Sequence, residues 1–250
     1  MFDNPFVLLA MTLAFVLAGL LKGVVGMGLP TVAMGVLGLF MAPAAAATLL
    51  ILPSLVTNVW QLAAGPAFGA LARRLAGLLA GLVAGTFMGI GVLTGASSAL
   101  PSAALGAVLA VYGVIGLAAP QFTVPARLEA WLSPPIGLAT GLVAGATGVF
   151  VIPAVPYLAS LGLAREALIQ ALGLCFTVST LALALALGLS APFPPALAAL
   201  SLLAVVPALA GLTLGRRVRG KLRPEVFRRW FFTGLVVLGL TMLARALVAR

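Results

Sequence analysis

The sequence predicts an all-α integral membrane protein made of two repeats of about four to five helical segments each, the second inverted relative to the first. Of the 250 residues, 63% are hydrophobic and only 7% are charged, whereas soluble domains usually carry about 25% charged residues. Two glycine-rich stretches interrupt the apolar sequence at corresponding positions of the two halves. Most basic residues stand in short loops between apolar segments, where they report membrane orientation.

The first transmembrane repeat is expected within residues 1–120. Its apolar segments are Pro5–Leu21, Thr31–Phe40, Pro43–Ala63, Leu75–Leu93 and Pro101–Ala119, with a loop at Gly65–Arg74. The first two are short against the roughly 20 residues that cross a hydrocarbon core of about 30 Å. Between them lies the first glycine motif, Ala18–Pro30, in which glycines and a proline disfavour a continuous helix. We therefore expect a broken or re-entrant helix here, which survives at membrane depth only against protein or a water-filled cavity.

The second transmembrane repeat is expected within residues 134–250, after a connector at 121–133. Its segments are Pro135–Gly148, Val149–Leu161, Ala167–Leu187, Pro195–Gly215 and Trp230–Val248. Superposing the halves pairs Gly19 with Gly141, Gly23 with Gly145, Gly26 with Gly148 and Gly89 with Gly211, and Pro30 meets Pro153 with a one-residue slip. In so apolar a chain, these glycine and proline matches are the informative ones, and they predict a second broken or re-entrant helix.

An odd number of crossings in each half inverts the second repeat. This plan places Arg73, Arg74, Arg127, Arg165 and the Arg216–Arg229 loop on one face, which is eleven of the fourteen basic residues. The rival plan fuses each short pair into one span, giving parallel repeats and separating these basic loops. The positive-inside tendency favours the inverted plan, with both chain ends outside.

Lys22 is the one basic residue within the first apolar tract. A charge at membrane depth costs about 2.5–3.5 kcal/mol on insertion scales, so it is a functional hypothesis by default. We expect Lys22 to bind an anion beside the backbone amides of Gly23, Gly26 and Gly28. A half-helix beginning near Pro30 would turn its positive end towards that anion. Two alternatives stay open: Lys22 snorkels to the interface, and the glycines serve close helix packing.

A polar stripe in the next segment has residues at spacings of three and four, which share one helical face. It comprises Ser54, Thr57, Asn58 and Gln61, and the second half has Gln170, Thr177, Ser179 and Thr180. Asn58 and Gln61 are expected to donate N–H bonds to the oxygens of an anion, or alternatively to join helices by hydrogen bonds worth about 0.6–2 kcal/mol each. The predicted substrate-binding residues are Lys22, Gly23, Gly26, Gly28, Pro30, Thr57, Asn58, Gln61, Gly145, Thr147, Gly148 and Gln170.

At these residues the chain resembles the sulfite exporter TauE/SafE family. The matching positions are Gly19, Gly23, Gly26, Gly28 and Pro30, then Ala44–Thr48, Ser54, Thr57 and Asn58, and in the second copy Gly141, Gly145, Gly148 and Pro153. Many members have consecutive glycines where this chain has Gly26-Met27-Gly28-Leu29. The resemblance implies transport of sulfite, organosulfonates or related sulfur-containing anions, usually export, in the plasma membrane of prokaryotes.

Several function classes are disfavoured by composition. The chain has no histidine and four acidic residues, so the constellations of enzymes and metal sites are not expected within the spans, nor is a cofactor or a side-chain proton relay. The expected partners are a small anionic substrate, membrane lipids and a possible second copy of the chain, but no nucleic acid. The Arg216–Arg229 loop is interpreted as a topology determinant facing anionic lipid. The alternatives are a transporter or channel for another small solute, or a polytopic scaffold without transport.

Overall fold

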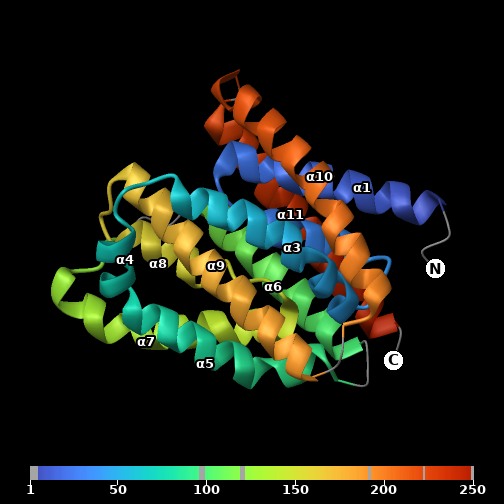
Figure 1. The fold of residues 1–250 in the computed structure, drawn as a ribbon, viewed down its shortest axis with the longest axis horizontal. Helices are drawn as coiled ribbons and strands as arrows, with labels where there is room; N and C mark the ends of the chain where they lie inside the picture. Colours follow the sequence, from blue (N-terminus) through green and yellow to red (C-terminus); the bar gives the residue numbers. More distant parts are fainter. Residues whose placement is uncertain (1–4, 96–98, 119–121, 191–192, 222, 249–250) are drawn as a thin grey trace.

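The computed structural model describes residues 5–95, 99–118, 122–190, 193–221 and 223–248. These residues form α-helices and one short 3₁₀ helix, and the described part contains no strand (Figure 1). The first half holds α1 (Pro5–Val25), α2 (Leu29–Leu37), α3 (Pro43–Ala63), α4 (Phe68–Arg74), α5 (Ala76–Leu93) and α6 (Ala99–Ala118). The second half holds α7 (Ala126–Thr147), α8 (Ala154–Ser160), α9 (Arg165–Ser190), α10 (Pro195–Val218), η1 (Arg219–Lys221) and α11 (Pro224–Val248).

Seven helices in the described residues are long and apolar enough to cross a membrane. They are α1, α3, α5, α6, α9, α10 and α11. The short helices α2, α4 and α8 are not among them, nor is the less apolar α7. The prediction of an all-α multi-pass membrane protein is thereby confirmed.

Four helix pairs form the framework: α5 with α7, α6 with α11, α1 with α10, and α3 with α9. Figure 1 shows α5 and α7 side by side along one edge, and α3 and α9 nearer the middle. Each pair joins a helix of the first half to a helix of the second half. The two halves are therefore interleaved in space instead of folding as separate bundles.

Glycines at every fourth position allow two of these pairs to pack with their backbones in contact. On α1, a Cβ at Gly19 would overlap the carbonyl oxygen of Ala208 on α10. On α5, a Cβ at Gly85 would overlap the carbonyl oxygen of Leu138 on α7, and one at Gly141 would overlap that of Leu82. Small residues at this spacing bring membrane helices together, so these glycines serve close helix packing.

Both glycine motifs break the helix, but only at their last glycines. Helix α1 continues through Gly19 and Gly23 and ends at Val25; Gly26 (φ 85°) and Gly28 (φ 103°) then reverse the chain in left-handed conformations. In the second copy α7 ends at Thr147, Gly148 (φ 73°) follows in a left-handed conformation, and residues 149–153 are not helical. Glycine adopts positive φ without the steric cost that a Cβ imposes.

Two expected boundaries were wrong. Helix α7 begins at Ala126, inside the predicted connector, and contains Pro134 and Pro135, where a helix start had been expected. The carbonyl groups that these prolines leave without a donor belong to residues 130 and 131, and Trp131 beside them is 81% exposed, so water or headgroups can hydrogen-bond to them. The predicted loop Gly65–Arg74 also contains helix α4.

A proline inside α3 is compensated by a hydroxyl from α10. Pro53 has no N–H to offer the carbonyl of Leu49, one turn earlier. Ser201 Oγ donates a hydrogen bond to that carbonyl at 2.9 Å and accepts one from the N–H of Leu52 at 3.3 Å. The carbonyl of Leu49 and the N–H of Leu52 therefore stay hydrogen-bonded although Pro53 interrupts α3 in its buried part. Thr57 and Asn58 lie about one turn further along the helix.

Candidate functional site

Lys22 lies in the last turn of α1 and is almost completely buried, with 3% of its surface exposed. Its amine donates hydrogen bonds to Oγ1 of Thr57, at 3.1 Å, and to the side-chain oxygen of Asn58. Both acceptors lie on α3, across the α1–α3 space. The side chain therefore points into the protein, not towards the bilayer surface.

The charge of Lys22 has no carboxylate partner in the described residues. The single ion pair found there joins Arg74 to Glu129, with 2.6 Å between nitrogen and oxygen. The oxygens that surround the Lys22 amine belong to neutral groups. A buried cation without a counterion is costly, and in membrane proteins such a residue usually marks a substrate or ion pathway.

Asn58 connects this cation to the second half of the chain. Its amide nitrogen donates to the carbonyl oxygen of Phe176, at 3.2 Å, and to Oγ1 of Thr180, at 3.1 Å, both on α9. Its oxygen meanwhile accepts from Lys22. One side chain therefore ties α1, α3 and α9 together, and the cation lies between segments of both halves.

Two buried hydroxyl oxygens have no hydrogen-bond partner in the described structure: Ser54 Oγ on α3 and Thr31 Oγ1 on α2. Ser54 lies one turn before Asn58 on α3, and Thr31 lies in the first turn of α2, just after the chain break. Buried hydroxyls are normally paired. Each of these hydroxyls therefore still has a hydrogen-bond donor to offer, on α2 and on α3, the helices next to Lys22.

The two predicted glutamines have other partners, at the end of α3 and the start of α9. Gln61 donates to the carbonyl of Ile169 at 3.0 Å. Gln170 donates to the carbonyls of Leu62 (2.9 Å) and Gly65, and accepts from the N–H of Ala67 at 2.9 Å. Their polar groups bond backbone, so they fasten α3 and the turn after it to α9 and are not gathered around Lys22.

The structure does not gather the remaining predicted residues at Lys22 either. Gly23 and Gly145 lie in the backbone contacts with α10 and α5, and Pro30 is buried in the first turn of α2. Thr147 uses its hydroxyl within its own turn, donating to Val143 and accepting from Val149. Gly148 packs against Met34 and Ala47, so the second motif touches α2 and α3. Gly26 borders open space, and Gly28 faces the ring of Phe231.

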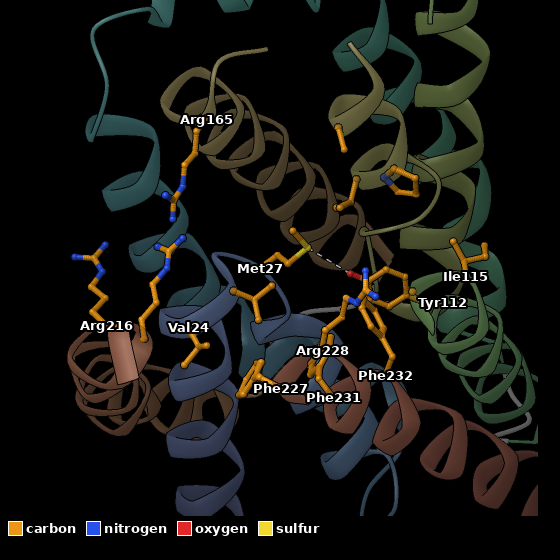
Figure 2. A pocket seen from close by; sticks show the side chains of 17 residues that line it. Val24, Met27, Tyr112, Ile115, Arg165, Arg216, Phe227, Arg228, Phe231 and Phe232 are labelled. Carbon is orange, nitrogen blue, oxygen red and sulfur yellow. Dashed lines mark hydrogen bonds between the residues drawn. The ribbon is translucent and has the colours of Figure 1, made fainter. Parts of the chain in front are cut away.

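A cavity opens just beyond Lys22, at the end of α1. Val24, Val25 and Met27 line it from the first half, and Val155 with neighbouring residues of α8 lines it from the second (Figure 2). Its wall also contains four arginines, Arg165, Arg216, Arg219 and Arg228. The sequence analysis did not assign these arginines to a site, because their convergence depends on how α9, α10 and α11 pack.

The family model for the sulfite exporter TauE/SafE proteins matches residues 11–242, nearly the whole chain. The chain belongs to the sulfite exporter TauE/SafE family. As a TauE/SafE protein it is a multi-pass cell-membrane transporter and not an enzyme, and the family implies sulfite-type anions as substrates. No curated protein and no solved structure matches the chain.

Proposed function

We propose that this protein exports small sulfur-containing anions, such as sulfite or organosulfonates, through a site at Lys22 between the two repeats. The observation that carries the proposal is the buried Lys22 amine, held by neutral oxygens of Thr57 and Asn58 and without a carboxylate partner in the described residues. A transported anion supplies the missing counterion, and its oxygens accept charge-assisted hydrogen bonds from the amine.

The neutral partners of Lys22 give the site a way to exchange. The side-chain oxygens of Thr57 and Asn58 accept hydrogen bonds from the amine. When an anion arrives, the amine can turn from these oxygens to the ligand without breaking an ion pair. A fixed carboxylate would compete with the substrate far more strongly, because it would add the attraction between opposite charges to its hydrogen bond with the amine.

We also propose that the two halves are inverted repeats, with this site between them. The helix directions support the proposal. Along α1 and α10 residue numbers rise together, since Gly19 lies at Ala208 and Gly23 at Leu212, so these helices are parallel. Along α3 and α9 they run oppositely, since Asn58 meets Thr180 whereas Gln61 meets Ile169.

Inversion of the second repeat accounts for both pairings. Helices α3 and α9 occupy equivalent places in the two halves, and parallel repeats would make equivalent helices run in the same direction. Equivalent helices of inverted repeats run in opposite directions, as α3 and α9 do. In many transporters of this design the substrate site lies between the repeats near the bilayer midplane, at interrupted helices.

Efflux from proteoliposomes tests the proposed substrate class. Purified protein would be reconstituted with sulfite, sulfoacetate, taurine, thiosulfate or sulfate inside, and release would be followed against protein-free vesicles. Saturable release of sulfite or an organosulfonate is expected. Release of none of the five compounds, or release of cations instead, would overturn the proposal.

A further inference from the structure

The cavity at the end of α1 has a composition that the transport of sulfite does not require. It has a volume of about 780 Å³. Four guanidinium groups reach it from three separate parts of the chain: Arg165 at the start of α9, Arg216 and Arg219 at the end of α10 and in η1, and Arg228 in α11. Figure 2 shows Arg165 and Arg216 on one side of the cavity and Arg228 on the other, beside Tyr112.

This positive charge is not balanced within the cavity. None of the residues that line it is acidic, and the described structure gives these four arginines no ion pair and no hydrogen bond; Arg216 stacks over Trp60, 5.2 Å from the ring centre. Like charges in a cleft with apolar walls repel one another and attract a counter-ion. Guanidinium groups also present paired N–H donors that fit sulfonate, carboxylate and phosphate oxygens.

The remaining wall is mostly apolar and includes four aromatic residues. Phe227, Phe231 and Phe232 of α11 line it together with Tyr112 of α6, and the rings of Tyr112 and Phe232 lie 5.3 Å apart, edge to face. Cavities of about 300–1,000 Å³ hold organic ligands of considerable size. Sulfite would fill a small part of this volume and would leave the aromatic wall unused.

We propose that this arginine–aromatic cavity is a second anion site, which binds an organic anion with an apolar body. The anionic head lies among the four arginines, and the body packs against the phenylalanines of α11. Orientation in the membrane explains basic residues on one face, but it does not require residues of α9, α10 and α11 to converge on one hollow. Lys22 is not among the residues that line this cavity.

Binding of naphthalene-2-sulfonate tests this site directly. The full chain would be placed in phosphatidylcholine nanodiscs and titrated by calorimetry. The double variant Arg216→Gln/Arg228→Gln should bind at least about tenfold more weakly, as expected for lost charge-assisted bonds. Arg217→Gln/Arg229→Gln removes the same charge from neighbouring exposed residues that do not line the cavity, and its affinity should stay within about twofold. Equal weakening in both double variants would overturn the proposal.

Two further measurements keep the proposal falsifiable if a variant does not fold. In the unmodified protein, methanesulfonate carries the same head without the body, and it should bind at least about tenfold more weakly, since burying an aromatic body contributes more than the 1.4 kcal/mol that this factor requires. Equal affinity would contradict an amphipathic ligand. In Lys22→Met, naphthalene-2-sulfonate affinity should be unchanged; a loss would place the ligand at Lys22.

The same anionic head on an apolar body occurs in soluble organic anions and in anionic lipids. Nanodiscs containing phosphatidylglycerol distinguish these sources. Competition that disappears in Arg216→Gln/Arg228→Gln identifies the lipid as the occupant, and no competition identifies a soluble anion; each supports the proposed ligand chemistry. The site can fail these tests while sulfite efflux persists, so its failure is distinguishable from failure of the transport proposal.

Discussion

The amine of Lys22 lies 3.1 Å from Oγ1 of Thr57 and also donates to the side-chain oxygen of Asn58, in the buried space between α1 and α3. These acceptors are neutral, so they solvate the cation without cancelling its charge. Our account of transport depends on that arrangement, because it leaves an anion as the natural partner of Lys22.

Replacing Asn58 by aspartate should inactivate the site. The new carboxylate would stand next to the Lys22 amine, as a permanent counterion that competes with the substrate. We expect sulfite affinity to fall at least about tenfold, a loss of about 1.4 kcal/mol, while the protein still purifies as a folded species. Calorimetric titration of sulfite measures the effect. Unchanged affinity in Asn58→Asp would show that the anion does not bind at this amine.

The hydroxyl of Ser201 should contribute most to the free energy of unfolding when Pro53 is present. Ser201→Ala leaves the carbonyl of Leu49 without its donor, at an expected cost of about 1–2 kcal/mol in the free energy of unfolding. In Pro53→Ala the new N–H can bond to Leu49 itself, so the double variant should lose less than the sum of the two single changes. Unfolding in detergent titrations measures this cycle. Strict additivity would contradict the proposed compensation.

Two glycines of α5 should respond oppositely to alanine. A Cβ at Gly85 would overlap the carbonyl of Leu138, so Gly85→Ala should destabilise the α5–α7 pair by about 1–3 kcal/mol. Gly91 lies on the same helix and faces open space, so Gly91→Ala should change stability by less than about 1 kcal/mol, towards greater stability. Equal effects in unfolding measurements would show that the close glycine contact is not what holds this pair.

Anion efflux should be driven by voltage. An inside-negative potential favours the exit of each negative charge by about 2.3 kcal/mol per 100 mV, and we expect no proton carried by a side chain. Methanesulfonate is a suitable probe if it is transported, because it stays ionised near neutral pH. Its efflux should accelerate when potassium and valinomycin impose an inside-negative potential at constant pH. At zero potential, its efflux should be insensitive to a pH gradient. Dependence on the pH gradient alone would contradict this expectation.

Much of the fold can be predicted from composition and spacing, because a membrane span must be long, apolar and helical. The apolar segments and both interruptions are examples. The boundaries of α7 could not be predicted, because Pro134 and Pro135 normally favour a helix start and only their exposed surroundings permit them inside one. The pairing of α1 with α10 and of α5 with α7 is likewise a tertiary property.

Only the part of the site around Lys22 could be predicted from the sequence. Lys22 stands out because a lysine within an apolar tract is costly, and its contact with Thr57 and Asn58 joins two features that the sequence shows separately. Gln61 and Gln170 were grouped with them by helical periodicity, but their partners are backbone groups that no periodicity reveals. The arginines of the cavity carried no distinguishing signal in the sequence, since basic loops serve orientation in any membrane protein.

Sulfite binding to two lysine variants is the most direct test of the central claim. The chain has two lysines: Lys22 is buried in α1, and Lys221 is exposed in η1. Titration of the purified protein should show that Lys22→Met weakens sulfite binding at least about a hundredfold, as expected when a buried charge partner is removed, whereas Lys221→Met stays within about twofold of the unmodified protein. If Lys22→Met bound sulfite as tightly as Lys221→Met, the anion would not be the partner of the buried amine, and the account would be wrong.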